Sequence, residues 1–552
     1  MAILRKHWAL AFVVVLSLVT TWVLFLPGYF SHHDDLQTLR IFEMRKCIVD
    51  QQIPCRWVPD MGYGYGYPLF NYYNPGIYYI GAVLSYAVGY LGAVKVLFMS
   101  ALLLGPLGVY FLVQKLWGEL PAVIGASLFI FAPYRALDIY ARGALSELFA
   151  LALAPFIFLL MLGLSEKRTR LYTITLSLVF GLFLITHNVS ALMWAPFFAV
   201  WSVYVLWKNP KILMNLIAAG VLGIGLSAFF ILPAFLERDL VGTHTLVSGD
   251  LDYRLHFASV GQLFLDRSWG YGASKPGPND DLSLQIGWPH WWVVAAGVVY
   301  LTYLYTKKRI KKDKLLLPGV LGLSFFLSLL MTHNKSTFIW EHIKLLGFVQ
   351  FPWRFLGICV FFTSLFGGYL VYLVDNKKSV SKKYLLAVSL VTLTVILNIS
   401  YFSPKTLYLD ATDDAKLTGG ELEGQKKGAI LDYLPKSAKV PQIVSDGQPK
   451  VIVGDVEVKN FYLTSDSWRF ETKNSGGDFE VEVPVFNFPE WRSNYDIYTS
   501  ENGRIVVRGS EDSEVYGYFE NTKIRNIGNS ITLLSIFTLL VYSSYGIVKK
   551  NN

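Results

Sequence analysis

The sequence predicts a mainly α-helical, polytopic membrane protein with about twelve transmembrane helices and a β-rich domain near the carboxyl end. Hydrophobic residues make up 53% of the 552 positions and charged residues only 16%, whereas roughly a quarter of the residues in soluble domains are charged. Long apolar runs alternate with short basic loops, as expected for membrane spans. An alternating apolar and acidic stretch at residues 478–485, between the last two predicted spans, predicts β-structure.

The spans follow from apolar runs of about 20 residues, the length that crosses a bilayer as a helix. The first run follows Arg5 and Lys6 and has no A-x-A-like cleavage site before Pro27, so we interpret it as a retained signal anchor. The predicted spans lie near residues 8–27, 93–114, 119–133, 144–164, 171–187, 188–206, 213–233, 289–306, 315–332, 354–374, 384–402 and 528–547.

The distribution of lysine and arginine orients these spans. Placing Arg5 and Lys6 inside puts nearly every dense basic cluster inside as well, as the positive-inside rule requires. These clusters are Lys115, residues 166–170, Lys208 and Lys211, residues 307–314, residues 377–383, and Lys549 with Lys550. The net charge of +9 therefore indicates cytoplasmic loops, not a nucleic-acid surface. We expect a plasma-membrane protein with both termini cytoplasmic and the β-rich domain outside.

Residues 77–91 form a further apolar stretch that decides this topology. Counting the stretch as a span would reverse every later loop and place the basic clusters outside. It has about 15 residues and follows Asn74-Pro75-Gly76. We therefore expect an amphipathic or juxtamembrane helix at the interface.

The topology divides the chain into three parts. Residues 1–402 form a transmembrane domain with external loops 28–92, 134–143 and 236–288. Residues 403–526 form an external β-sandwich-like domain, and residues 527–552 form a last span with a short cytoplasmic tail. The β prediction rests on the apolar strand face of Phe479, Val481, Val483 and Val485, and on a hairpin turn at Asn502-Gly503.

The three cysteines separate into a pair and a single residue. Cys359 lies in an apolar run and is expected to be inert packing. Cys47 and Cys55 share the first external loop, where a disulfide and two free thiols are both open alternatives.

Ionisable residues that could carry chemistry are concentrated in the external loops. The first loop opens with His33, Asp34 and Asp35, which suit a general base or a hard-cation site, although Asp34 is also a good helix cap. The second loop carries Asp138 and Arg142, and Glu147 follows about one turn inside the next span. A carboxylate at that depth is costly unless it meets Arg142, water or a cation, so Glu147 is a functional candidate.

Further candidates for substrate binding lie at other external helix ends. His187 and Asn188 join two spans, and Arg354 in Phe351-Pro352-Trp353-Arg354-Phe355 could bind a phosphate at headgroup level. Tyr65 and Tyr67 lie in a loop rich in glycine and aromatic residues, which suits sugar stacking or interfacial anchoring. No Walker loop, G-x-S-x-G motif or zinc spacing occurs, which argues against ATP-driven transport and common hydrolase chemistry.

Several ordered motifs resemble one group of bacterial and archaeal membrane proteins, those with a 6-pyruvoyl-tetrahydropterin synthase-related domain, which are akin to YfhO-like proteins. The resemblance spans nearly the whole chain and departs from the group at Gln37-Thr38, where relatives tend to have a histidine, and at Glu490, where a glycine is usual. The matching motifs begin with His33-Asp34, Arg56-Trp57-Val58-Pro59-Asp60, and Gly64-Tyr65-Gly66-Tyr67-Pro68 with the residues to Tyr73. They continue with Arg142-Gly143-Ala144-Leu145-Ser146-Glu147, Thr186-His187-Asn188, the Phe351 to Phe355 motif, Phe488-Pro489-Glu490-Trp491 and Asn521-Thr522-Lys523-Ile524-Arg525.

Such proteins resemble GT-C glycosyltransferases, and this resemblance implies a function. It implies transfer of a sugar from a polyprenyl-phosphate donor, a membrane lipid, to an extracytoplasmic acceptor of the cell envelope, with Asp34 as base and Asp138 as a second acidic residue. Arg354 or Arg142 would pair with the phosphate. Asp35, Asp138 or Glu147 could instead hold a divalent cation such as Mg²⁺ or Mn²⁺, and both versions stay open.

Two rival functions come from other classes. A lipid-linked carrier or flippase predicts charged residues spread through the middle of several spans, whereas here they gather at the external face. A non-catalytic scaffold for envelope glycopolymers predicts that Asp34, Asp138 and Glu147 tolerate substitution together. Convergence of these three carboxylates around one cavity favours an enzyme.

Overall fold

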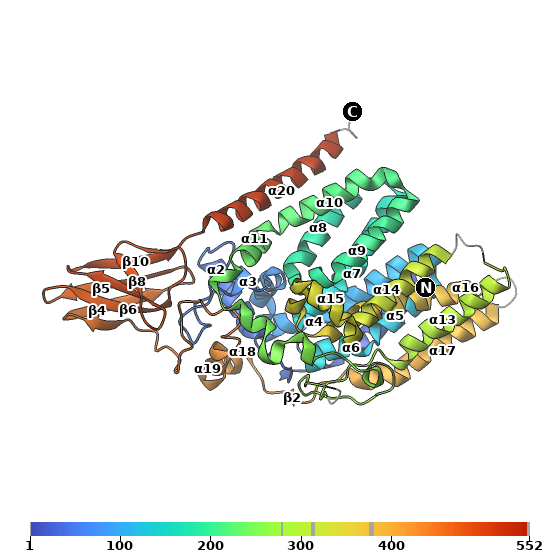
Figure 1. Cartoon of the computed structure of the whole chain (residues 1–552), viewed down its shortest axis with the longest axis horizontal. Helices are drawn as coiled ribbons and strands as arrows, with labels where there is room; N and C mark the ends of the chain where they lie inside the picture. The colour runs from blue at the N-terminus through green and yellow to red at the C-terminus, as the bar shows by residue number, and fades with distance from the viewer. Residues whose placement is uncertain (1, 278–279, 311–314, 375–379, 549–552) are drawn as a thin grey trace.

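In the computed structural model, which describes residues 2–277, 280–310, 315–374 and 380–548, a helical part is followed by a β-sandwich (Figure 1). Parts of the predicted basic clusters, residues 311–314 and 377–379 together with Lys549 and Lys550, lie outside the described ranges. The helices are α1 Ala2–Val19, α2 Gln37–Val49, α3 Leu69–Tyr72, α4 Gly76–Trp117, α5 Glu119–Ile130, α6 Pro133–Ala136, α7 Leu145–Glu166, α8 Arg170–Thr186, α9 Asn188–Lys208, α10 Leu213–Leu226, α11 Ala228–Leu236, α12 Val260–Phe264, α13 Trp288–Thr306, α14 Leu316–Thr332, α15 Thr337–His342, α16 Leu356–Leu373, α17 Val380–Asn398, α18 Asp413–Leu417, α19 Gly419–Lys427 and α20 Lys523–Val548.

The membrane character of the helical part is clear from helix length and composition. Within the described residues, six helices are long and apolar enough to cross a bilayer, or up to nine if each of three bent pairs counts as one span. The expected count of about twelve is not confirmed. Some of the apolar runs fold as helices of fewer than 18 residues, among them His7–Val19 and Arg170–Thr186, and a rise of about 1.5 Å per residue leaves such helices short of a 30 Å hydrocarbon core.

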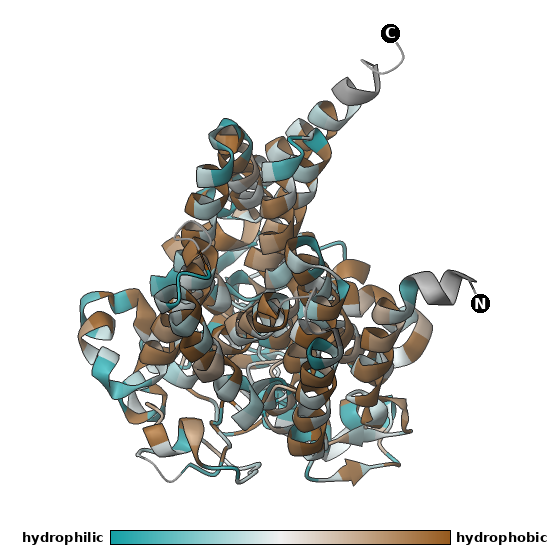
Figure 2. Cartoon of the chain, turned by 90° about the vertical axis from the view of Figure 1, so that its right-hand side faces the viewer, coloured by the Kyte–Doolittle hydropathy of each residue, from teal (hydrophilic) through white to brown (hydrophobic). Residues whose placement is uncertain are grey.

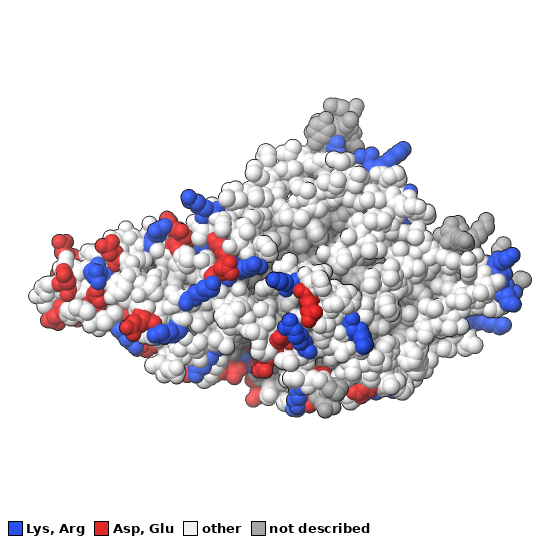
Figure 3. Space-filling model, in the orientation of Figure 1, with Lys and Arg blue, Asp and Glu red and all other residues white. Residues whose placement is uncertain are grey.

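The outer surfaces of these helices are apolar, as membrane contact requires. In Figure 2 the helices are largely hydrophobic, and hydrophilic colour is concentrated in the connecting segments. On α20, for example, the side chain of Leu533 is 66% exposed and that of Phe537 is 65% exposed. On the face shown in Figure 3, only Lys and Arg are visible at the end of the helical part farthest from the sandwich. We predict that this basic end faces the cytoplasm.

The stretch 77–91 belongs to a long helix that is broken at Gly89. Helix α4 runs over Gly76–Trp117, and Gly89 inside it has φ 74° and ψ 178°, so two helices meet at a kink. Asp413 fixes the break, because its carboxylate accepts hydrogen bonds from the backbone N–H groups of Tyr90 and Leu91, both at 2.7 Å. A separate helix before the span fits the expected juxtamembrane helix, whose position in the bilayer stays a prediction.

The β-rich region is a two-layer antiparallel sandwich, as the sequence predicts. One sheet has the strand order β4-β5-β10-β7 and the other β3-β6-β9-β8. The predicted apolar face of β6 is buried, and β8 pairs with β9 across Asn502-Gly503. The strands are β3 Lys450–Val453, β4 Val456–Leu463, β5 Ser467–Asn474, β6 Phe479–Phe486, β7 Trp491–Ser493, β8 Asp496–Thr499, β9 Arg504–Gly509 and β10 Ser513–Phe519; a small separate sheet pairs β1 Tyr29–Phe30 with β2 Leu407–Tyr408.

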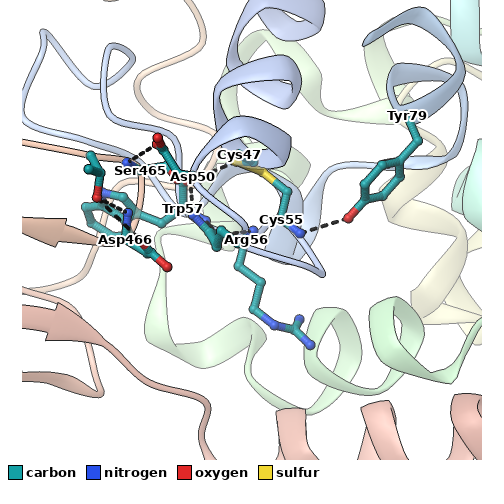
Figure 4. The surroundings of a disulfide bond; sticks show 10 residues. Cys47, Asp50, Cys55, Arg56, Trp57, Tyr79, Ser465 and Asp466 are labelled. Atoms are coloured by element: carbon teal, nitrogen blue, oxygen red, sulfur yellow. Dashed lines mark hydrogen bonds between the residues drawn. A yellow bond between two sulfur atoms is a disulfide. The ribbon is translucent and has the colours of Figure 1, made fainter. Parts of the chain in front are cut away.

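The first long loop, residues 28–92, packs against this sandwich. Trp57 is 1% exposed, and its ring lies 5.7 Å from that of Trp491 and 5.8 Å from that of Phe488, measured between centroids. Figure 4 shows this junction: Asp50 at the end of α2 accepts a 2.7 Å hydrogen bond from the backbone N–H of Ser465. These contacts hold the loop between the helices and the sheets.

A disulfide joins Cys47 to Cys55 in this loop (Figure 4) and resolves the alternative that the sequence leaves open. Cys359 is a buried free thiol. We expect maleimide labelling of unfolded protein to modify one cysteine before reduction and three after it. Because the closed loop is short, replacing Cys47 with serine should lower the free energy of unfolding by about 2 to 3 kcal/mol. Labelling of three thiols without reduction would contradict the bond.

Candidate functional site

A large cavity lies where the first two long loops and later connections meet the ends of the helices. Its volume is about 1110 Å³, slightly above the range of roughly 300 to 1,000 Å³ that is usual for small-molecule sites. Eight of the residues predicted from the sequence line it: His33, Asp34, Asp35, Arg142, Glu147, His187, Asn188 and Arg354. Two of the three carboxylates expected to converge, Asp34 and Glu147, line this cavity, whereas Asp138 does not.

The loops 28–92 and 134–143 are joined directly through their backbones. The N–H of His33 donates to the carbonyl of Ala141, and that of Asp34 donates to the carbonyl of Arg142, both at 3.0 Å. Gly143 makes this approach possible, because it has φ +65° and a Cβ there would lie 2.1 Å from Nδ1 of His32. Any side chain at position 143 would push the two loops apart.

Asp34 is held by two donors from α2. Its Oδ2 accepts a 2.8 Å hydrogen bond from Arg40 and a 3.0 Å bond from Gln37. Gln37 also donates to the carbonyl of Gly143 at 2.9 Å and accepts from the hydroxyl of Tyr78 at 2.7 Å. Gln37 thus orients Asp34 against the second loop.

Glu147 lies at the centre of a buried charge network. Its Oε2 is 2.9 Å from Arg142 and 3.3 Å from Arg354, and its Oε1 accepts a hydrogen bond from Tyr134. Arg142 also pairs with Asp138 and lies 4.7 Å above the ring of Trp353. Two carboxylates therefore balance two guanidinium groups, which is what makes such a cluster tolerable away from water.

Asp138 is fully buried and does not line the cavity. It acts on the site through Arg142, its ion-pair partner. His187 caps the amino end of α9 by accepting a 3.2 Å hydrogen bond from the N–H of Ser190. Its Nδ1 is therefore engaged in holding the helix while the ring borders the cavity.

Asp35 faces Lys416, a residue of α18 far along the chain. Their side chains are 2.5 Å apart. Burial raises the pKa of Asp35, and the Lys416 ammonium opposes that shift. Burial also lowers the pKa of the neighbouring His32 to about 4, so that its imidazole is neutral at pH 7.

The residues predicted as metal ligands are not arranged for a cation. Asp35 and Asp138 face Lys416 and Arg142. Throughout the described ranges, no group of three or more His, Cys, Asp or Glu side chains could hold a metal ion. The donor set does not fit Mg²⁺ or Mn²⁺.

Tyr65 and Tyr67, predicted as substrate-binding, lie outside the cavity lining. Tyr65 packs against Phe486 of the sandwich and under Arg504, whose guanidinium is 3.9 Å from the ring centre. Tyr67 is 0% exposed and donates a 2.5 Å hydrogen bond to the carbonyl of Ala429. Both tyrosines position neighbouring segments.

Sequence reasoning missed several residues that line the cavity, notably Arg40, Arg238, Asp432 and Tyr433. Arg238 follows α11 and lies over the ring of Phe235 at 5.2 Å. Asp432 and Tyr433 come from the connection between the helices and the sandwich. No motif marks these residues, and only Arg40 lies close in sequence to a predicted site residue.

Comparisons with known proteins agree with the membrane assignment. A crystal structure of the Archaeoglobus fulgidus oligosaccharyltransferase, in complex with zinc and sulfate, is 14% identical, with 72% of this chain and 53% of that chain covered and a TM-score of 0.39. The chain thus spans about half the length of that protein, and the score is too low to establish a shared fold. No curated protein matches the chain. Residues 70–403, more than half of the sequence, match a family described as the 6-pyruvoyl-tetrahydropterin synthase related domain, a membrane protein, and the chain belongs to that family.

Proposed function

We propose that this protein is a GT-C-type membrane glycosyltransferase that moves a sugar from a polyprenyl-phosphate donor to an extracytoplasmic acceptor. The observation that carries the proposal is the 1110 Å³ cavity at the helix ends, which combines carboxylates, arginines and an apolar wall. A lipid-linked sugar phosphate needs all three kinds of group.

The apolar wall suits the lipid tail of such a donor. Helices α9 and α11 and the segment Lys344–Val349 contribute aliphatic and aromatic side chains to one part of the cavity. A tail lying there would bury apolar surface, which stabilises binding by roughly 25 cal/mol per Å². The side chains are Val189, Leu192, Ala234, Phe235, Leu345 and Phe348.

Two arginines border the same wall and suit the phosphate. Arg354 lies 3.3 Å from Glu147 through its Nε, while Arg238 has no ion-pair partner among the described residues. Phosphate needs compensation of the charge that develops as it leaves the sugar. We assign this role to Arg238 and Arg354, with Arg142 holding Glu147 in place.

The polar wall suits the acceptor. This part of the lining comes from the first loop with α2 and from the connection after α19. Its polar side chains are Asp34, Arg40, Asp432 and Tyr433. An acceptor hydroxyl bound there would attack the anomeric carbon with inversion, and a carboxylate within hydrogen-bond reach would take its proton.

The test is transfer by cells that carry only a variant of the protein. Deleting the gene should remove a surface glycan that mass spectrometry detects, and the wild-type gene should restore it. Arg354→Gln should lower restoration by about 100-fold, because removing one charge-stabilising group typically costs that much.

Arg492→Gln is the matched control, because its side chain is 56% exposed on the sandwich. It should restore the glycan fully. An unchanged glycan profile after deletion would overturn the proposal. Full restoration by Arg354→Gln would overturn the role of that arginine and favour the scaffold alternative.

A further inference from the structure

The connection after α19 forms part of the cavity wall and is held in place by the Tyr67 hydroxyl. This hydroxyl donates to the carbonyls of Ala429 and Ile430, at 2.5 and 3.2 Å, and accepts a 2.7 Å bond from the N–H of Tyr433. The ring of Tyr433 stacks on Tyr72, with centroids 5.6 Å apart and planes 21° apart. These contacts with Tyr67 and Tyr72 fix the backbone on both sides of Asp432, whose side chain lines the cavity.

Asp432 differs from the other carboxylates that line the cavity. Asp34 pairs with Arg40, and Glu147 pairs with two arginines. Lys416 pairs with both Asp35 and Glu421. Among the described residues, the Asp432 carboxylate has no ion pair or hydrogen bond, and Asp250, which shares this property, is exposed. Asp432 is thus the half-buried carboxylate whose oxygens are free for a ligand.

The surroundings of Asp432 suit a group that gains and loses a proton near neutral pH. Burial raises its pKa to about 6; nearby Arg40 lowers the pKa and Asp34 raises it. The other titratable groups that interact with it are Tyr67 and Tyr433, whose own pKa values are raised by burial, so that both stay neutral at physiological pH. A base with a pKa near the working pH combines availability with proton affinity.

We infer that Asp432 is the catalytic base, taking the proton from the acceptor hydroxyl; this rests on the proposed function. The hydroxyl O–H bond breaks as its oxygen forms a bond to the anomeric carbon. The bond from that carbon to the phosphate oxygen breaks, and polyprenyl phosphate leaves with the electron pair. The proton ends on Asp432, while Asp34 holds Arg40 beside it as a positioning residue.

The sequence-based expectation gave this role to Asp34. In the structure, the guanidinium of Arg40 lies 2.8 Å from Asp34 Oδ2, and Gln37 donates to the same oxygen. These donors occupy Oδ2 of Asp34, whereas the Asp432 carboxylate accepts no hydrogen bond from the described residues. The unpaired Asp432 is the better base of the two.

The experiment measures glycan restoration in gene-deleted cells after a short pulse of expression, with the external buffer set between pH 5 and 8. Wild-type activity should rise through about pH 6 and level off above it, because only the ionised base accepts a proton. Asp432→Asn should be at least 100-fold less active at pH 7.5 and should lose this rise. Asp432→Glu should recover part of the activity with the pH dependence.

Asp446→Asn is the matched control, since Asp446 is exposed in the same connection and pairs with Lys450 at 3.5 Å. It should match wild type, and membrane levels of all variants are measured by immunoblot. Activity of Asp432→Asn within threefold of wild type, or the same acid limb in that variant, would overturn the inference while leaving the proposed function intact. Failure of the deletion to change any glycan would overturn the proposed function, and the assignment of Asp432 with it.

Discussion

Replacing Glu147 with glutamine is expected to lower the free energy of unfolding by about 3 to 5 kcal/mol, the usual cost of removing one partner from a buried ion pair. The Glu147 side chain is 7% exposed and faces Arg142 and Arg354, which are 9% and 12% exposed. If the charge of Glu147 is removed, only Asp138 remains to balance the two buried guanidinium groups.

Thermal unfolding of the detergent-solubilised protein measures this effect. Glu166→Gln is the matched control, because Glu166 ends the same helix and its carboxylate, 42% exposed, pairs with Lys115 at 2.5 Å. An exposed pair contributes about 1 kcal/mol or less, so the control should shift the melting temperature little. Equal shifts in the two variants would show that Glu147 is not a buried counter-charge.

The double variant Glu147→Gln with Arg354→Gln refines the test. It removes one cation together with one anion and leaves Arg142 paired with Asp138. We expect it to be more stable than Glu147→Gln alone, since residues of one charge network are not additive. If the stability loss of the double variant equals the sum of the losses of the two single variants, the two side chains do not interact and the arginine is solvated.

Much of the site could be predicted because an ionisable residue inside a membrane span needs a partner of opposite charge, water or a cation. A carboxylate such as Glu147 just inside a span needs a partner, and Arg142 lies five residues earlier. The sandwich was also predictable, because the alternation over Phe479 to Val485 fixes which face is buried. In both cases a local pattern carries the information.

The rest depends on contacts between distant segments. Asp432 reaches the cavity because Tyr67, 365 positions earlier than Asp432 in the chain numbering, holds its segment, and no local pattern encodes that pairing. Tyr67 was predicted to bind substrate because aromatic residues suit both packing and ligand contact, and burial alone separates the two. The span count is not confirmed, because a hydropathy run does not show how long its helix is or where it bends, as in the pair Pro210–Leu226 and Ala228–Leu236, which is bent by 70°.

Replacing Glu237 with glutamine should also cost about 3 to 5 kcal/mol, for the same reason of a broken buried pair. Glu237 lies at the end of α11, and its Oε2 is 2.9 Å from Nε of Arg525 in the first turn of α20. The side chains are 3% and 0% exposed. Thr522 donates a hydrogen bond to the other oxygen of Glu237, and Asn71 donates to Oε2 at 3.3 Å.

This pair fastens the last helix, which follows the sandwich directly, to the helices that border the cavity. Arg56 reinforces the junction through hydrogen bonds to Asn521 at 3.1 Å and to Asn529 at 2.9 Å. Limited proteolysis of Glu237→Gln should therefore release a fragment containing the sandwich and α20 sooner than in wild type, whereas Glu490→Gln, a surface partner of Arg492, should not. Because Asp432 lies in the connection that leads into the sandwich, loosening this junction should also lower glycan restoration. If Glu237→Gln keeps an intact junction and full activity, the sandwich is held by its contacts with the first loop alone.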